Sequence, residues 1–375
     1  MIFGIPLKRV NWITSSFLIL TALLAFTATP WYIWNHGIDL FQASLFFFYF
    51  CATGFSITLG YHRNFSHLSF KAKWPVRLFT LIFGAAAFEN AALDWCSDHR
   101  KHHKHVDHDD DPYDITKGFF HAHIGWLLFR LHPLPPMDNV ADLRRDSLVM
   151  WQYRWCQWIA VTVGFILPAA MGWMYGGPQA ALGAFLIAGV ARVVFVQHMA
   201  FFINSLCHTI GKQPYSTKHT ARDSPLMAIL TYGEGYHNYH HEFQHDYRNG
   251  VKPWQFDPTK WIIWSLNKVG LTSNLRRVPE DRILLAEATE ARLQLDARLS
   301  CSKTQLSDKT RELLQASHDA LSNLSQIISE RHQEYLRATE KHLEHSKEII
   351  EELRHELHLA IKRLAQVPIP VHVLS

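Results

Sequence analysis

Four long apolar stretches alternate with polar segments in the first 202 residues of this 375-residue chain. They cover residues 12–34, 40–59, 151–175 and 179–202. An apolar helix of about 20 residues crosses the hydrocarbon layer of a membrane, and each stretch reaches that length. Short polar turns join the stretches in pairs, at 35–39 and 176–178. The pattern therefore predicts a multi-pass integral membrane protein built from two helical hairpins.

Basic residues gather at one end of both predicted hairpins. The two turns contain no Lys or Arg, whereas the segments at the other ends include Lys8, Arg9, Arg63, Lys71, Arg100, Lys101, Lys104, Arg144 and Arg145. Positive charge marks the cytoplasmic side of a membrane protein. We therefore expect residues 1–11 and the C-terminus in the cytoplasm, and the inner membrane as the location if the source is bacterial. The first apolar run is longer than a signal-peptide core, so we expect a retained helix.

The composition changes after residue 279. Segment 280–366 is rich in Glu, Lys, Arg, Gln and Leu and contains no proline. Leu343, Ile350, Leu357 and Leu364 recur at the seven-residue spacing of a coiled coil. We predict a membrane domain over 12–278 and a helical tail over 279–375. The tail helix would pack on itself, on a second copy of the chain, on another partner or on the membrane surface, or remain solvated.

Three clusters of histidine carry the candidate chemistry. They are His62 and His67 in HRNFSH, His99, His102 and His103 in HRKHH, and His237, His240 and His241 in HNYHH. Side chains at i, i+3 and i+4 share one face of a helix, so each of the last two clusters can present three imidazoles together. The first pair is five residues apart, a spacing that an ideal α-helix does not align. We therefore expect a helix end or a distortion there.

Clustered imidazoles restrict the metals that this chain can bind. Neutral imidazole suits zinc, copper, iron and nickel, whereas calcium and magnesium prefer oxygen ligands. A zinc site has four protein ligands, or three and a water, so eight histidines are enough for two ions, and two redox metals side by side fit better. The five cysteines form no CxxC pair, which argues against an iron–sulfur cluster or a zinc ribbon.

A fifth apolar stretch, 76–92, follows Pro75 and includes Glu89 and Asn90. If it crossed the membrane, the first histidine cluster would lie on the opposite side from the second. We therefore predict a helix that lies in the membrane interface and returns to the same side.

Four segments occur together in this chain: HRNFSH; DHRKHHKHVDHDDDPY followed by GFFHAHIGW; INSLCHTIGKQPY; and GEGYHNYHHEF. This combination resembles the membrane-bound fatty acyl desaturases, specifically the stearoyl-CoA (delta-9) branch. The resemblance covers about residues 45–266. Alkane, sterol and sphingolipid hydroxylases share the general histidine boxes but not this combined set.

The resemblance implies an all-α protein with four membrane helices under a cytosolic helical cap, and two iron ions bound at their junction. Carried over by motif, Asn204 would hold one metal through a water, and the direct ligands would be His62, His67, His99, His102, His103, His208, His237, His240 and His241. Only the resemblance, and not the spacing of the histidines, indicates His208 as a ligand. In the animal enzymes a glutamine, a tryptophan and a threonine help to bend the acyl tunnel, and the matching positions here are Glu89, Trp95 and Ala200.

Removal of hydrogens from two unactivated methylenes requires an oxidant that side chains cannot supply. The implied reaction is O2-dependent formation of a cis double bond in an acyl-CoA or acyl-lipid, at delta-9, with reduction of O2 to water. The chain shows no HPGG haem motif, Rossmann fingerprint or ferredoxin cysteines, so a separate electron donor, cytochrome b5 or a ferredoxin, is expected. The lack of a fused b5 domain indicates a bacterial enzyme. No nucleic-acid partner is expected.

Charged residues beside the histidines have two interpretations each. The carboxylates either hydrogen-bond the outer nitrogens of the ligands or lie on the surface; they are Asp94, Asp98, Asp107 and Glu242. The basic residues either dock an acidic electron donor or face an anionic membrane; they are Arg100, Lys101, Lys104 and Arg248.

Two other functions stay open at this point. A di-iron membrane hydroxylase has the same boxes, although the NSLCHTIG and GYHNYHH context favours desaturation. A non-enzymatic metal-binding or transport protein is the second alternative. A transporter places ionisable ligands inside its membrane spans, whereas these clusters lie outside the apolar stretches, and only His198 lies well within one.

Overall fold

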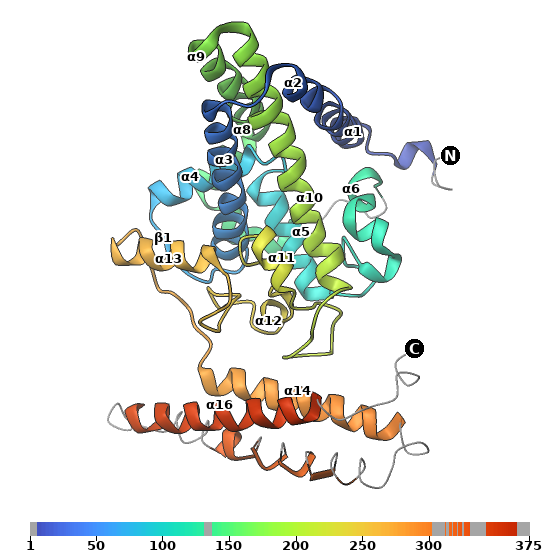
Figure 1. The fold of residues 1–375 in the computed structure, drawn as a ribbon, viewed down its shortest axis with the longest axis vertical. Coiled ribbons are helices and arrows are strands. Elements are labelled where there is room, and N and C mark those ends of the chain that lie inside the picture. The colour runs from blue at the N-terminus through green and yellow to red at the C-terminus, as the bar shows by residue number, and fades with distance from the viewer. Residues whose placement is uncertain are drawn as a thin grey trace. The chain divides into compact units, whose positions relative to one another are not determined.

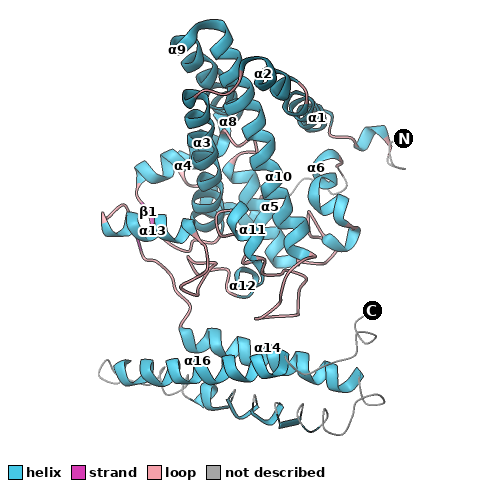
Figure 2. Cartoon of the chain, viewed as in Figure 1, coloured by secondary structure: helices cyan, strands magenta, loops and turns pink. Residues whose placement is uncertain are grey.

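The computed structural model of the chain describes residues 6–130, 137–301, 312, 315–316, 318–320, 322–324, 326–330 and 343–365. These residues are mainly helical, as Figures 1 and 2 show. The chain forms two compact units. The first comprises residues 1–212 and 219–277, and the second comprises residues 213–218 and 278–375.

Three helical segments of the first unit are long and apolar enough to cross a membrane: Trp12–His36, Leu40–Ser66 and Ser147–His208. The first consists of α1 (Trp12–Phe26) and α2 (Ala28–His36). The second consists of α3 (Leu40–Phe55) and a π-helix (Ser56–Ser66). A capping box between Asp39 and Gln42 begins α3, because each side chain satisfies a backbone N–H of the other residue.

The third segment is a helical hairpin. Its elements are α8 (Ser147–Val161), a π-turn (Thr162–Ile166), α9 (Leu167–Ala184), a second π-turn (Phe185–Ala191), α10 (Arg192–Ser205) and a 3-10 turn (Leu206–His208). Helical geometry is lost at Gly176 and Gly177, where φ is +71° at Gly177, and the chain reverses there (Figure 1). The predicted stretches 151–175 and 179–202 therefore correspond to the two arms of this hairpin, which meet at the predicted turn 176–178.

The two arms approach each other closely at Gly172. A Cβ at this position would lie 2.4 Å from the carbonyl oxygen of Ala180, so only glycine fits. Arg192 fixes the lower part of the hairpin. Its fully buried guanidinium donates to the carbonyls of Ala188, Ala86 and Gly164, and so ties α10 to the end of α4 and to the first π-turn.

The fifth apolar stretch forms α4 (Trp74–Ala85). Its 12 residues span about 18 Å, which is too short to cross a membrane. The helix ends at Ala85 rather than near residue 92, because Phe88 and Asn90 take positive φ values of 59° and 71°. The next helix is α5 (Ala92–His105). A core that includes Tyr61, Leu81 and Cys96 packs α4 and α5 against the π-helix, so the first two histidine clusters lie together.

Short elements complete the first unit. Strands β1 (Lys71–Ala72) and β2 (Thr272–Ser273) pair antiparallel. The remaining α-helices are α6 (Trp126–Leu128), α7 (Ala141–Arg144), α11 (Pro225–Leu230), α12 (His237–Glu242) and α13 (Pro258–Lys268). The 3-10 turns are Leu7–Arg9, Ile115–Lys117 and Asp138–Val140, and a π-turn covers His121–Gly125.

The second unit contains α14 (Glu280–Cys301) and α16 (Leu343–Ala365). They share an apolar core that includes Leu284 and Ala288 of α14 and Leu353 and Leu357 of α16. The tail therefore packs on itself. Of the predicted heptad row, Leu357 is fully buried, while the side chains of Leu343, Ile350 and Leu364 lie outside the described part of the chain. Association with a second copy stays a prediction.

Candidate metal centre

His62 and His67 are positioned by the π-helix Ser56–Ser66. A π-helix hydrogen-bonds residues five apart, and here the backbone N–H of His67 donates to the carbonyl of His62 at 3.1 Å. The five-residue spacing, which is out of phase in an α-helix, is in phase in a π-helix. The predicted distortion is therefore confirmed, and π-turns of this kind are often found at functional sites.

The other two clusters lie on α5 and α12. Each presents its histidines at i, i+3 and i+4, as predicted for one helical face. The short α12 is stabilised from outside. The buried Asp223 carboxylate accepts the backbone N–H groups of Asn238 and Tyr239, at 2.8 and 3.1 Å, and so satisfies donors that a helix N-terminus leaves without partners.

All nine predicted histidine ligands converge, and they sort into two groups. Within each group the nearest ring nitrogens lie within 4.8 Å of one another. The first group contains His62, His67, His99, His103 and His240. The second group contains His102, His208, His237 and His241. His102 and His103 are neighbours in sequence, yet they belong to different groups.

The spacing of the nitrogens suits shared metal ions. In the first group the Nε2 atoms of His67 and His99 are 2.8 Å apart, and those of His103 and His240 are 2.9 Å apart. In the second group the His102–His241 and His208–His237 Nε2 separations are 3.2 and 3.1 Å. Two nitrogens about 2.1 Å from one ion, at right angles, lie about 3.0 Å apart. The donor set therefore fits two imidazole-preferring ions.

The electrostatic environment favours the neutral form of most of these imidazoles. Burial, and then the neighbouring histidines, lower the pKa well below its usual range for His67, His99, His103, His237, His240 and His241. A neutral imidazole has a lone pair to donate to a metal. The site is therefore ready to bind cations at neutral pH.

Carboxylates outside the two groups orient individual histidines. The Nδ1 atom of His62 lies 2.8 Å from a Glu234 oxygen, and that of His102 lies 2.8 Å from an Asp111 oxygen. Such contacts leave Nε2 free for a metal and raise its basicity. A carboxylate supports His208 indirectly. The Nδ1 atom of His208 contacts the Thr220 hydroxyl at 2.8 Å, and this hydroxyl donates a hydrogen bond to Asp107 at 2.6 Å.

These partners correct the sequence-based choice of carboxylates. Among the four candidates only Asp107 supports a histidine, and it does so through Thr220. In the described part of the chain, Asp94, Asp98 and Glu242 make no hydrogen bond to any of the nine histidines. Adjacent helix positions are rotated by about 100°, so a carboxylate next to a histidine in sequence points elsewhere.

Arg63 holds Glu234 in place, a role that the sequence did not reveal. Its guanidinium donates two hydrogen bonds to Glu234, at 3.0 and 2.8 Å, and two to Asp257, at 3.1 and 3.0 Å. All three side chains are buried. Burial raises the pKa of Glu234, but the charge of Arg63 and the contact with His62 lower it below its ordinary value. Glu234 therefore faces His62 as a carboxylate.

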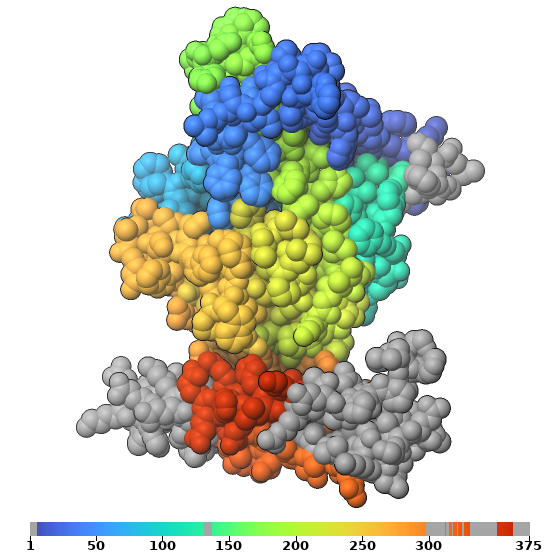
Figure 3. Space-filling view, in the orientation of Figure 1, coloured from blue at the N-terminus to red at the C-terminus, as the bar shows by residue number. Residues whose placement is uncertain are grey.

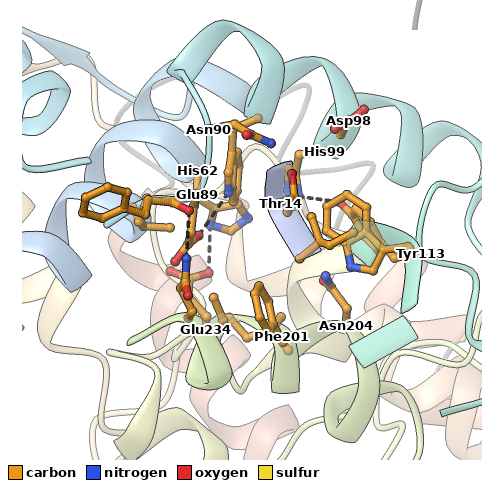
Figure 4. A pocket seen from close by; sticks show the side chains of 18 of the residues that line it. Thr14, His62, Glu89, Asn90, Asp98, His99, Tyr113, Phe201, Asn204 and Glu234 are labelled. Atoms are coloured by element: carbon orange, nitrogen blue, oxygen red, sulfur yellow. Dashed lines mark hydrogen bonds and ion pairs between the residues drawn. The ribbon is translucent and has the colours of Figure 1, made fainter. Parts of the chain in front are cut away.

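A pocket opens beside both histidine groups (Figure 4). His62 and His99 of the first group and His237 of the second line it, together with Asn204. Its other walls include apolar side chains from α1, α6 and α10, namely Phe17, Leu18, Leu127 and Phe201. An apolar molecule in this pocket contacts the metal-binding side chains directly.

The three predicted tunnel residues, Glu89, Trp95 and Ala200, all line this pocket. The indole of Trp95 stacks on His99, with ring centroids 4.8 Å apart, and its N–H donates to Glu89 at 3.3 Å. Burial raises the pKa of Glu89 to about 8. At neutral pH its side chain is therefore protonated and uncharged.

Glu89 gives a testable dependence of stability on pH. The folded chain keeps its proton up to about pH 8, whereas an ordinary glutamate loses it near 4.5. Between these values the folded state holds one more proton than the unfolded state, so raising the pH destabilises the fold. We expect the melting temperature of the wild type to fall relative to that of Glu89→Gln from pH 5 to pH 8, measured by thermal unfolding. Parallel curves would contradict the raised pKa.

The predicted docking arginines have structural partners. Arg100 forms a two-pronged ion pair with Asp142 and donates to the carbonyls of Phe65 and Ser66. Arg248 binds the Asp246 carboxylate. Both guanidiniums are engaged within the first unit. Of the two lysines, Lys104 is exposed and Lys101 is partly buried.

Comparisons with known proteins identify the family of this chain. The model of the Fatty acid desaturase family matches residues 40–268. The chain is 43% identical over 237 residues to the "Probable acyl-CoA desaturase" of Schizosaccharomyces pombe, covering 63% of this chain and 49% of that protein. It is 41% identical over 238 residues to "Acyl-CoA desaturase 1" of Saccharomyces cerevisiae, covering 63% and 46%.

The human "Stearoyl-CoA desaturase" is 34% identical over 281 residues, covering 73% of this chain and 76% of that protein. The chain spans about half the length of its two fungal relatives. These relatives are fungal and human, so they give no support to the predicted bacterial source. The family model alone matches more than half of the chain. The protein therefore belongs to the fatty acid desaturase family.

Proposed function

We propose that this chain is a membrane-bound, O2-dependent fatty acyl desaturase with a di-iron centre. It introduces a cis double bond, at delta-9, into a long saturated acyl chain carried as an acyl-CoA. The observation that carries the proposal is the pair of buried histidine groups that line one apolar pocket. The names of the relatives, acyl-CoA and stearoyl-CoA desaturases, support the choice of substrate class.

Each histidine group holds one metal ion in this proposal. His62, His67, His99, His103 and His240 bind the first, and His102, His208, His237 and His241 bind the second. Asn204, which lines the adjoining pocket, holds one of the two ions through a water. Bound iron supplies the activation of O2, which no side chain provides. Iron fits the imidazole donors, and two adjacent redox ions serve a two-electron oxidation better than zinc does.

The side chains of the chain supply position and environment. Glu234 and Asp111 fix the ring orientation of His62 and His102, so that Nε2 of each faces its group. The apolar walls hold an acyl chain against the histidines and exclude water, which fixes the methylene pair that reacts. Trp95, stacked on His99 and bonded to Glu89, sets the direction of the chain near this point.

The proposal includes a membrane topology and a separate electron donor. The two long segments near the N-terminus and the two arms of Ser147–His208 form four membrane spans, with α4 in the interface. The basic flanking segments support a cytoplasmic location of both termini and of the metal centre in this proposal. Electrons come from a separate protein, cytochrome b5 or a ferredoxin.

The fatty-acid profile of a desaturase-deficient host that expresses the chain tests this function. We expect new monounsaturated fatty acids by gas chromatography–mass spectrometry, with the double bond mapped by derivatisation. Hydroxylated chains would instead support a di-iron hydroxylase. An unchanged profile, despite bound iron and a supplied electron donor, would support a metal-binding protein without this activity.

A further inference from the structure

A second apolar cavity runs along α3, apart from the pocket beside the histidines. It has a volume of about 710 Å³, and no described residue lines both cavities. Ser44, Phe48, Cys51, Phe55 and Leu59 line it from one side. They are three or four residues apart, so they form one face of a continuous helix. The face is about 22 Å long at 1.5 Å per residue.

Helices α4 and α13 complete this groove. Val76 and Phe79 contribute from α4, and Ile262 and Leu266 contribute from α13. Figure 3 shows the α4 and α13 segments next to each other on one side of the first unit. Phe48 and Phe79 are exposed at 50% and 42%. Because α3 belongs to an apolar segment long enough to cross a membrane, the groove faces the hydrocarbon layer rather than water.

The segments that flank the groove carry positive charge only. Residues 65–88 and 258–279 contain no Asp or Glu. They include five exposed basic residues, Lys71, Lys73, Lys268, Arg276 and Arg277. Lys71 and Lys73 are fixed at the end of the groove. Lys71 pairs with Ser273 across β1 and β2, and the backbone N–H of Lys73 donates to Leu271, which lines the groove, at 2.9 Å.

We propose that this groove binds an anionic glycerophospholipid of the surrounding bilayer. One acyl chain lies along α3, and the phosphate headgroup lies beside Lys71 and Lys73. The length and apolar lining of the groove suit an extended acyl chain. The lysines distinguish an anionic headgroup from a zwitterionic one, because each basic residue near an anionic lipid surface contributes about fivefold in affinity. The proposal requires the membrane location but does not depend on desaturation.

Native mass spectrometry of the purified full chain in detergent tests the site. The probes are phosphatidylglycerol and phosphatidylcholine with the same acyl chains. We expect one phosphatidylglycerol to bind at least tenfold more tightly than phosphatidylcholine. Lys71→Gln with Lys73→Gln should reduce the affinity for phosphatidylglycerol by about 25-fold, to the level of phosphatidylcholine. Cys51→Trp, which fills the groove, should weaken both lipids.

Matched controls separate this site from general charge and surface effects. Arg144→Gln with Arg145→Gln removes the same charge from another exposed basic pair, and Leu23→Trp adds an indole on the exposed face of α1; neither should change lipid binding. Equal binding of both lipids by the wild type would overturn the proposal. An equal loss of affinity in the Arg144→Gln, Arg145→Gln variant and in the Lys71→Gln, Lys73→Gln variant would also overturn it. Displacement of the bound phosphatidylglycerol by an acyl-CoA would have the same consequence. The two lysine substitutions decide the outcome if Cys51→Trp does not fold.

Discussion

A variant with His102→Ala and His103→Ala should lose both metal ions and all measurable desaturation. The two residues are adjacent on α5 but belong to different histidine groups, so this single pair of substitutions removes one donor from each. Loss of one ligand weakens a metal site strongly, and an oxidation that depends on both ions then has no oxidant. We expect activity to fall by at least about a thousandfold.

Metal content separates this explanation from simple misfolding. Elemental analysis of the purified wild type should give two ions per chain, and the double variant should give fewer than one. His208→Ala with His237→Ala, which changes the second group only, should keep the ion of the first group. If this second variant lost both ions while its helical circular dichroism stayed intact, the division into two groups would be wrong.

Replacement of Arg63 by methionine should be the most destabilising single substitution tested outside the histidines. Glu234 and Asp257 would then be two buried carboxylates without the cation that they share. Removing one partner of a buried ion pair costs about 3–5 kcal/mol. In a domain of this size that corresponds to a fall in melting temperature of about 10 °C.

The position of His62 should change in the same variant, because Glu234 loses the group that holds it. We expect weaker metal binding at the first group, measured by titration of the apo-protein with cobalt(II) and its visible absorption. Arg63→Lys should fall between wild type and Arg63→Met, since it keeps the charge but loses the planar fork. Arg144→Met is the matched surface control and should change the melting temperature little. A similar melting temperature for Arg63→Met and Arg144→Met would show that the buried network contributes little.

The tertiary arrangement also decides which carboxylates support the histidines. Asp94 and Asp98 are near His99 in sequence, but on a helix they point in other directions. Asp111 and Glu234 support His102 and His62, although Glu234 is far from His62 in sequence. On a helix, residues three or four apart lie on the same face, whereas adjacent residues point in different directions. Proximity along the chain therefore does not by itself identify a contact.

The sequence by itself determined the local features of this protein. Apolar length indicated the long helices, glycines and a proline marked the reversal of the hairpin, and the five-residue spacing of His62 and His67 indicated a distorted helix. These features depend on interactions within about one or two helical turns, so they are readable from a single chain. The motifs then identified the family, because their residues occur in contiguous segments.

Only the tertiary structure decided which histidines face one another. The division of His102 and His103 between two groups depends on where α12 and the end of α10 meet α5. The link from Asp257 through Arg63 and Glu234 to His62 joins three segments that no periodicity connects. Such contacts form when distant elements pack together and buried polar groups must find partners. That requirement acts on the folded chain as a whole, and it leaves no local pattern in the sequence.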